Sequence, residues 1–465
     1  MKKVLSLILS TLVLCSMTGC SGETASTTIA NTTTEDDDVV NPVDISDIEL
    51  DMSKDIDISG TVLRYLGCYD ITKAGDIKPA VKYLEENYDC SIEVEIVSSL
   101  AIMEKMSTYI SSGNSPDLVD VQDDTFPYYI AKNAYEPLDG YFDLNAPQWI
   151  DCKPIIESYA IGGKCYYVPW AYSLNSRYLI YNRGLFTEYG IDDPKELYDA
   201  GTWTWDAMYK CMTDFTSKTS AEEPLGLYGS LASSFIATSG ESLITYKDGV
   251  FASNINSPAI TRAQNFLEKL RKEGLSAFAP KDSSSVDLEP IINGSCAFQA
   301  MGGWIVADFT KRMAKDETLD IFFVPMPRDP SADKYYYSYT TFGYMVPAGS
   351  EHVQAAAAFI DCCRLGHSDP ELLEVIRASE KRSKKYTDEM QEFMASFEEM
   401  GNFESDSLIL EYAYGIDSNL REQVINPMFE NMAFDNSEEQ TTWTVMRDSY
   451  SYLINESVDT INSTI

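Results

Sequence analysis

The sequence of 465 residues predicts an α/β protein made of two lobes. Residues 61–119 alternate between strand-like and helix-like periodicity in the order β-α-β-α-β, which favours a parallel sheet with helices on its faces. The composition, 44% apolar and 12% aromatic, is that of a chain with a substantial core. The ordered part, about 400 residues, exceeds what one core usually serves, so we expect two lobes.

The first predicted elements follow one another closely. They are a strand over 61–66, a helix over 76–88, a strand over 92–96, a helix from 102 to 110 and a strand from 117. Gly113 suits the C-terminal cap of the second helix. Ligands of open α/β sheets bind beyond the carboxyl ends of strands, so the loops at 67–70 and 122–126 are candidate sites.

The rest of the chain predicts mixed but mostly helical structure. A strand-like segment at 341–346 leads into an alanine-rich helix over 353–364, and helices dominate from there to the C-terminus. Trp203 and Trp205 flank Thr204, which we expect to cap the helix that follows, so both tryptophans are expected to be structural.

The N-terminus has the features of an export signal. Lys2 and Lys3 precede an apolar run over 4–14 that is too short for a permanent membrane helix. The sequence Met-Thr-Gly-Cys at 17–20 resembles the lipobox of bacterial lipoproteins. This resemblance implies that residues 1–19 are a signal peptide and that Cys20 carries lipid chains.

Residues 20–58 are acidic and rich in Ser and Thr, with almost nothing apolar to bury, which predicts a flexible stalk. The formal net charge of −38 argues against nucleic acid or an anionic membrane surface as a partner. Beyond the signal, eight cysteines between Cys68 and Cys363 show no disulfide framework, and we expect most to be buried thiols.

Eight segments resemble, in order, those of extracellular solute-binding proteins of sugar ABC importers, the group that includes maltose-binding protein. The segments are 112–119 (SGNSPDLV), 163–169 (GKCYYVP), 179–186 (LIYNRGLF), 190–194 (GIDDP), 204–206 (TWD), 302–304 (GGW), 324–327 (VPMP) and 342–361. Each motif is weak alone, and the order of all eight carries the resemblance over about residues 60–365.

The resemblance implies the periplasmic-binding-protein-like fold, in which two α/β lobes joined by a hinge close over a ligand. It assigns residues 59–172 with 343–395 to lobe one. Residues 173–342 with 396–465 form lobe two. Segments 170–175 and 336–343 would be the hinge strands.

The same resemblance implies a lipid-anchored binding protein on the extracellular face of the cell membrane. It would capture a carbohydrate, an oligosaccharide in particular, and deliver it to the permease subunits of an ABC importer. It would act as a monomer, without a cofactor or metal. Two alternatives stay open: a surface glycoside hydrolase, and a binder of another small polar solute such as a polyamine.

The family also indicates ligand-binding side chains. Trp304 matches its sugar-stacking tryptophan, although a buried core tryptophan is the alternative. Trp170 and Tyr172 fall at the first crossing between the lobes, and Asn175 falls near a polar residue of the family's site.

Two further pairs of residues belong to the exit loops of the predicted strands. Asp124 matches an acidic site residue of the family, and its neighbour Asp123 is an equal alternative. Tyr69 and Asp70 lie in the loop after the first strand.

No catalytic motif supports an enzyme. The two histidines, His352 and His367, pair with no recognisable nucleophile, and the sequence has no nucleophile elbow, zinc helix or phosphate-binding loop. A glycosidase needs only two carboxylates, which 73 acidic residues do not exclude. We therefore expect a binding protein rather than an enzyme.

Overall fold

The computed structural model describes residues 56–73, 77–121, 125–174, 177–231, 233–278, 287–398, 407–434 and 442–465. All of them belong to one compact unit, Pro42–Ile465. The signal peptide, Cys20 and most of the predicted stalk lie outside the described residues.

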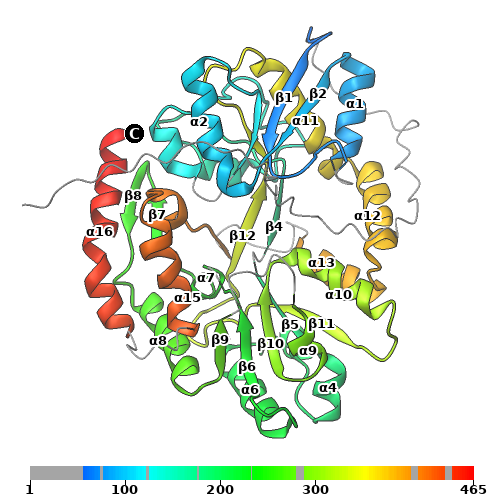
Figure 1. Ribbon diagram of the computed structural model, residues 1–465, viewed down its shortest axis with the longest axis vertical. Coiled ribbons are helices and arrows are strands. Elements are labelled where there is room, and N and C mark those ends of the chain that lie inside the picture. Colours follow the sequence, from blue (N-terminus) through cyan, green and yellow to red (C-terminus); the bar gives the residue numbers. More distant parts are fainter. Residues whose placement is uncertain are drawn as a thin grey trace, which may run out of the picture. The chain divides into compact units, whose positions relative to one another are not determined.

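The first sheet confirms the predicted β-α-β-α-β order. It has the strand order β13-β3-β1-β2 and comprises β1 (Val62–Gly67), β2 (Ser91–Ile96), β3 (Leu118–Asp120) and β13 (Tyr344–Met345). Strands β2 and β3 run parallel to β1, and β13 runs antiparallel to β3. Helices α1 (Lys78–Tyr88), α2 (Ile102–Ser112) and α11 (Val353–Ser368) belong to this lobe, and α2 ends at Gly113 with φ +69° as expected (Figure 1).

The second sheet lies in the part of the chain that was expected to be mostly helical. Its order is β11-β5-β10-β6-β9, with β5 (Tyr178–Asn182), β6 (Leu225–Gly229), β9 (Ser276–Phe278), β10 (Cys296–Met301) and β11 (Ile321–Pro325). Every residue of β5 and β11 is buried, so these strands lack the polar alternation that identifies a half-exposed strand.

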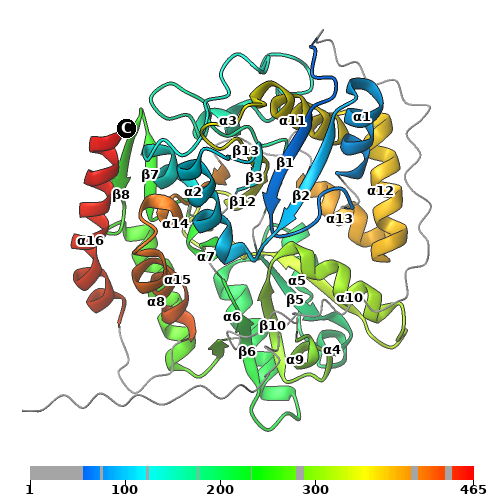
Figure 2. The same cartoon turned by 45° about the horizontal axis from the view of Figure 1, so that its top comes forward.

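Helices surround the second sheet. They are α4 (Arg183–Glu188), α5 (Pro194–Asp199), α6 (Trp205–Lys218), α7 (Ser234–Ala237), α8 (Pro258–Lys272), α9 (Glu289–Ile292) and α10 (Val306–Met313). Thr204 caps α6 by accepting the N–H of Ala207, and Trp203 and Trp205 are buried, as predicted. A hairpin of β7 (Ile244–Lys247) and β8 (Val250–Ser253) lies beside the C-terminal helix α16 (Trp443–Thr464) (Figure 2).

The chain passes between the two sheets along β4 (Ala171–Leu174) and returns along β12 (Tyr337–Phe342). These strands pair antiparallel with each other, and β14 (Leu408–Ile409) adds to β12 in parallel. We call the β4–β12 pair the crossing ribbon, and Figure 1 shows it between the two sheets. Its strands fall within the segments 170–175 and 336–343, where the resemblance placed the hinge strands.

The remaining elements are α3 (Lys153–Ser158), α12 (Pro370–Lys384), α13 (Asp388–Glu398), α14 (Ala413–Ile416), α15 (Asn426–Phe434) and four short turns, Ser99–Ala101, Thr125–Tyr129, Gly303–Ile305 and Arg421–Ile425. Phe393 of α13 packs its ring 5.6 Å from Phe322 and 5.7 Å from Phe323 on β11. Phe393, placed in lobe one by the predicted boundary at 395, thus contacts the second sheet.

Glu411 fixes the segment after β14 to the start of the β7 strand. Its carboxylate accepts the backbone N–H groups of Leu243 at 2.7 Å, Ile244 at 3.1 Å and Ala413 at 3.0 Å. Burial of this carboxylate raises the pKa of Glu411 from 4.5 to about 7, and the three N–H bonds only partly oppose the shift.

Stability should therefore depend on the protonation of Glu411. Because the pKa of Glu411 is higher in the folded state, protonation of this carboxyl group favours folding. Its contribution to the unfolding free energy is full below about pH 4.5 and is lost as the pH rises through about 7. Between about pH 5 and about pH 8, the unfolding free energy of the wild type should fall by up to about 3 kcal/mol more than that of Glu411→Gln. Urea unfolding of both proteins at the two pH values measures this difference, and equal losses would contradict it.

Candidate functional site

The carboxyl ends of β1 and β3 meet at one edge of the first sheet because the two strands are parallel. The loop after β1 begins at Cys68, and β3 ends at Asp120. The Asp120 carboxylate accepts the backbone N–H of Cys68 at 3.1 Å and its thiol at 3.6 Å. Asp120 is only 7% exposed, and burial raises the pKa of its carboxyl group. One buried carboxylate therefore sets the start of the exit loop.

Gly67 is required at the end of β1. A Cβ atom at this position would lie 1.9 Å from the Tyr65 hydroxyl oxygen and 2.6 Å from Oδ2 of Asp120. Both distances are far inside van der Waals contact, so any side chain here would displace the tyrosine and the carboxylate together.

The two predicted residues of this loop differ in their surroundings. Tyr69 is 42% exposed, and its ring stands edge-on to Tyr65 at 6.5 Å. The oxygens of Asp70 are engaged locally, since Oδ1 accepts the N–H of Thr72 at 3.1 Å and its hydroxyl at 2.6 Å, and Oδ2 pairs with Lys73 at 2.7 Å. The hydrogen bonds from Lys73 and Thr72 lower the pKa of Asp70.

Trp170 lies at the entry to the crossing ribbon and is 3% exposed. Its ring lies 4.8 Å from His367, 6.3 Å from Tyr344 and 6.1 Å from Phe342, while its carbonyl accepts Nη1 of Arg364 at 3.0 Å. Trp170 is thus held firmly at the junction between the first sheet and the ribbon.

A chain of ring contacts links two of the predicted residues. Tyr69 contacts Tyr65, Tyr65 contacts Tyr344 at 5.7 Å, and Tyr344 contacts Trp170, which contacts Phe342. We call these five residues the aromatic row. Its two ends, Tyr69 and Phe342, are 42% and 44% exposed, whereas its three middle members are buried. The row therefore presents a flat ring to solvent at each end.

Of the other predicted site residues, the structure describes only Tyr172 in full. Tyr172 is partly buried on β4, opposite Thr341 of β12. Asp123, Asp124 and Asn175 lie outside the described residues, as does the side chain of Trp304, whose backbone forms the short turn Gly303–Ile305 after β10. These assignments stay predictions.

Sequence reasoning did not single out Asp120 or Phe342, and it included Cys68 only as part of the candidate loop 67–70. Asp120 could have been noticed as an acidic residue that ends an apolar strand at the predicted ligand edge. Phe342 ends a segment in which Ser338, Thr340 and Phe342 alternate with tyrosine and threonine, a period-two pattern that separates the two faces of a strand.

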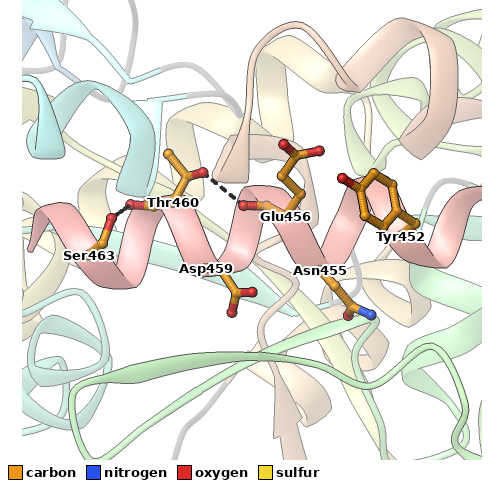
Figure 3. Close-up of a pocket in the computed structure, with 6 residues that line it drawn as sticks. All are labelled: Tyr452, Asn455, Glu456, Asp459, Thr460 and Ser463. Carbon is orange, nitrogen blue, oxygen red and sulfur yellow. Dashed lines mark hydrogen bonds between the residues drawn. The ribbon is translucent and has the colours of Figure 1, made fainter.

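Hollows also lie elsewhere. One, of about 310 Å³, is lined by α3, residues 240–246, Tyr339 and residues 408–412. A second, of about 450 Å³, is lined by residues 157–163, residues 246–250, Asn462 and Ile465. A third, of about 480 Å³, runs along α16 alone (Figure 3). There Thr460 and Ser463 donate their hydroxyls to carbonyls of their own helix, and Asn455 and Asp459 point away from Glu456. The side chains on α16 do not converge on a ligand.

Among the residues that the structure describes, no three His, Cys, Asp or Glu side chains gather as metal ligands would. Within the same residues, no helix combines the length and the apolar character needed to span a membrane.

The sequence profile of the bacterial extracellular solute-binding protein family matches residues 71–363, more than half of the chain. The chain therefore belongs to this family, a family of binding proteins rather than enzymes, as the motifs predicted. The diacetylchitobiose binding protein DasA of Streptomyces coelicolor is 25% identical over 261 residues, which cover 54% of this chain and 57% of DasA. The chain thus spans less than two thirds of the length of this relative.

Solved structures confirm the two-lobed α/β fold. The GacH receptor of Streptomyces glaucescens, solved without ligand and with acarbose, has a TM-score of 0.63 at 15% identity and covers 86% of this chain and 100% of its own. UgpB of Mycobacterium tuberculosis, solved with glycerophosphocholine, has a TM-score of 0.61 at 14% identity and covers 86% of this chain and 99% of its own.

The contact between Asp120 and Cys68 is open to a chemical test. Burial, and then the charge of Asp120, raise the pKa of the Cys68 thiol. Asp120→Asn removes that charge, so the thiolate fraction at about pH 8 should rise and Cys68 should react with a disulfide reagent about threefold faster or more.

Cys68→Ser is the control, because Cys68 is the one exposed thiol among the eight cysteines of the described residues. It should abolish the fast phase of the reaction. An unchanged rate in Asp120→Asn would show that the carboxylate does not hold this thiol.

Proposed function

We propose that this protein captures a carbohydrate, an oligosaccharide in particular, outside the cell and delivers it to the permease subunits of an ABC importer. The observation that carries this proposal is the aromatic row, which presents Tyr69 and Phe342 at the edge where the first sheet meets the crossing ribbon. Flat rings suit the C–H faces of sugar rings. DasA is a diacetylchitobiose binding protein and the GacH receptor was solved with acarbose, and these two ligands support the same substrate class.

The binding site combines groups from both lobes. Trp304 stacks on the sugar, the Asp124 carboxylate accepts hydrogen bonds from its hydroxyls, and the Asn175 amide donates or accepts others. Trp170 is 3% exposed and Tyr172 is partly buried, so these two predicted residues support the site from the crossing ribbon without stacking on the ligand. Asp123 is the alternative to Asp124, and Tyr69 and Asp70 line the edge of the site. Contacts from both lobes form only when the lobes are closed, so the ligand shifts the population toward the closed state.

No chemical step is assigned to the protein, and it needs no cofactor. It acts as a monomer and is tethered to the outer face of the cell membrane through Cys20. The complex of UgpB with glycerophosphocholine illustrates why another small polar solute has to be tested beside sugars.

Thermal unfolding against a ligand panel tests the substrate class. We expect an oligosaccharide series to raise the melting temperature of the protein from residue 21 onward, because a ligand at a hundredfold excess over its Kd stabilises the folded state by about 2.7 kcal/mol. The panel includes monosaccharides, oligosaccharides, polyamines and glycerophosphocholine. A shift with a non-sugar alone would overturn the carbohydrate assignment, and release of cleaved sugar would establish a hydrolase instead.

The lipid anchor has its own test. When the full chain is expressed in a bacterium with lipoprotein processing, the wild type should sediment with the membrane fraction. Cys20→Ser should move it to the soluble fraction, because acyl chains supply the membrane affinity. Ser16→Ala, a change inside the signal away from the cysteine, is the control and should leave the protein with the membrane. Membrane retention of Cys20→Ser would contradict the anchor.

A further inference from the structure

The crossing ribbon has two faces, because side chains directly opposite each other on paired antiparallel strands lie on the same side. Ala171 pairs with Phe342 and Ser173 pairs with Thr340, which places these four residues on one face. Tyr172 and Thr341 pair on the other face.

The face that carries Tyr172 and Thr341 is covered. The Thr341 hydroxyl accepts the Tyr167 hydroxyl at 3.0 Å and lies 3.3 Å from the Tyr159 hydroxyl. Tyr339 and Leu174, the next pair on this face, are both buried. The 310 Å³ hollow also lies on this side, since Tyr339 lines it.

The opposite face is open. Phe342 is 44% exposed, Thr340 is exposed and Ser173 is partly exposed. Phenylalanine is usually buried, and here its exposed ring shares one face of the ribbon with the exposed Thr340 and the partly exposed Ser173. None of the four side chains on this face carries a charge.

Phe342 is also held in place. Its carbonyl accepts the N–H of Trp170 at 3.0 Å, and the two rings lie 6.1 Å apart with a tilt of 31°. Trp170 is in turn fixed by Arg364 and His367. A ring that is fixed before binding loses little conformational entropy when a ligand stacks on it.

We propose that the open face of the crossing ribbon is the floor of the ligand site. Phe342 stacks on the C–H face of a sugar ring, the hydroxyls of Thr340 and Ser173 bond to its hydroxyl groups, and the buried Trp170 positions Phe342 from behind. The uncharged floor selects a neutral sugar ring over a polyamine or a phosphodiester. This inference rests on the proposed carbohydrate function and adds to it the residues that select the ligand.

The test is calorimetric titration of the purified protein with maltotetraose, mannobiose and diacetylchitobiose. For the sugar that binds, Phe342→Ala should lower affinity about tenfold or more, whereas Phe342→Trp should retain it, because a flat ring remains. Thr340→Val should weaken binding and Thr340→Ser should retain it, because only the first variant removes the hydroxyl. Tyr452→Ala, which removes an exposed ring on α16, is the control and should have no effect.

Phe342→Leu, with apolar bulk but no flat ring, replaces Phe342→Ala if the alanine variant does not fold. The proposed role of the open face would be wrong if the folded Phe342 variant and Thr340→Val both kept full affinity while Trp304→Ala lost it. That result would leave the carbohydrate function intact. Failure of all three sugars to bind the wild type would overturn both.

Discussion

The structure depends on the antiparallel pairing of β4 with β12. The chain builds most of the first sheet, crosses once along β4, builds the whole second sheet and returns along β12 to add β13 beside β3. Within the part of the chain that the structure describes, the strands that lead from one sheet to the other are therefore bonded to each other in a single ribbon. A ligand held between the two sheets near this ribbon would contact groups from both.

The carboxylates that the structure describes at the first sheet's edge are engaged by other protein groups. The chain has a formal net charge of −38, yet Asp120 accepts hydrogen bonds from Cys68, and Asp70 from Thr72 and Lys73. A carboxylate that already accepts such bonds is less available to a ligand. Among the residues that the structure describes here, Tyr69 and Phe342 present aromatic rings and Thr340 presents a hydroxyl, and such groups suit an uncharged, hydroxyl-rich solute.

Local patterns predicted the first lobe well. Ile92, Val94 and Ile96 alternate with glutamates and form β2 at the edge of the sheet, where one side of the strand meets solvent. Periodicity did not predict the second sheet because β5 and β11 are buried on both sides. The sequence of such a strand is a short apolar run, and a segment of a buried helix has the same pattern. Chain length predicted two lobes, and the family motifs predicted the hinged fold that joins them.

Individual site residues were harder to predict for a physical reason. Alternation along β4 shows that Tyr172 and Ser173 face opposite ways, but the open face is decided by Tyr159 and Tyr167, which pack on Thr341 from other elements. Asp70 is different, because an aspartate two residues before a threonine is a readable turn signal that predicts local hydrogen bonds. Tertiary packing therefore decides which polar side chains remain accessible to a ligand. The spacing of residues along the sequence does not reveal this packing.

A crystal structure of the protein with the bound oligosaccharide would test the central claim most directly. The account predicts that one sugar ring lies on Phe342 and that the same ligand contacts the loop after β1 and the turn Gly303–Ile305 after β10. A ligand that contacts a single sheet, or that occupies the hollow beside Tyr339 on the covered face of the ribbon, would contradict it.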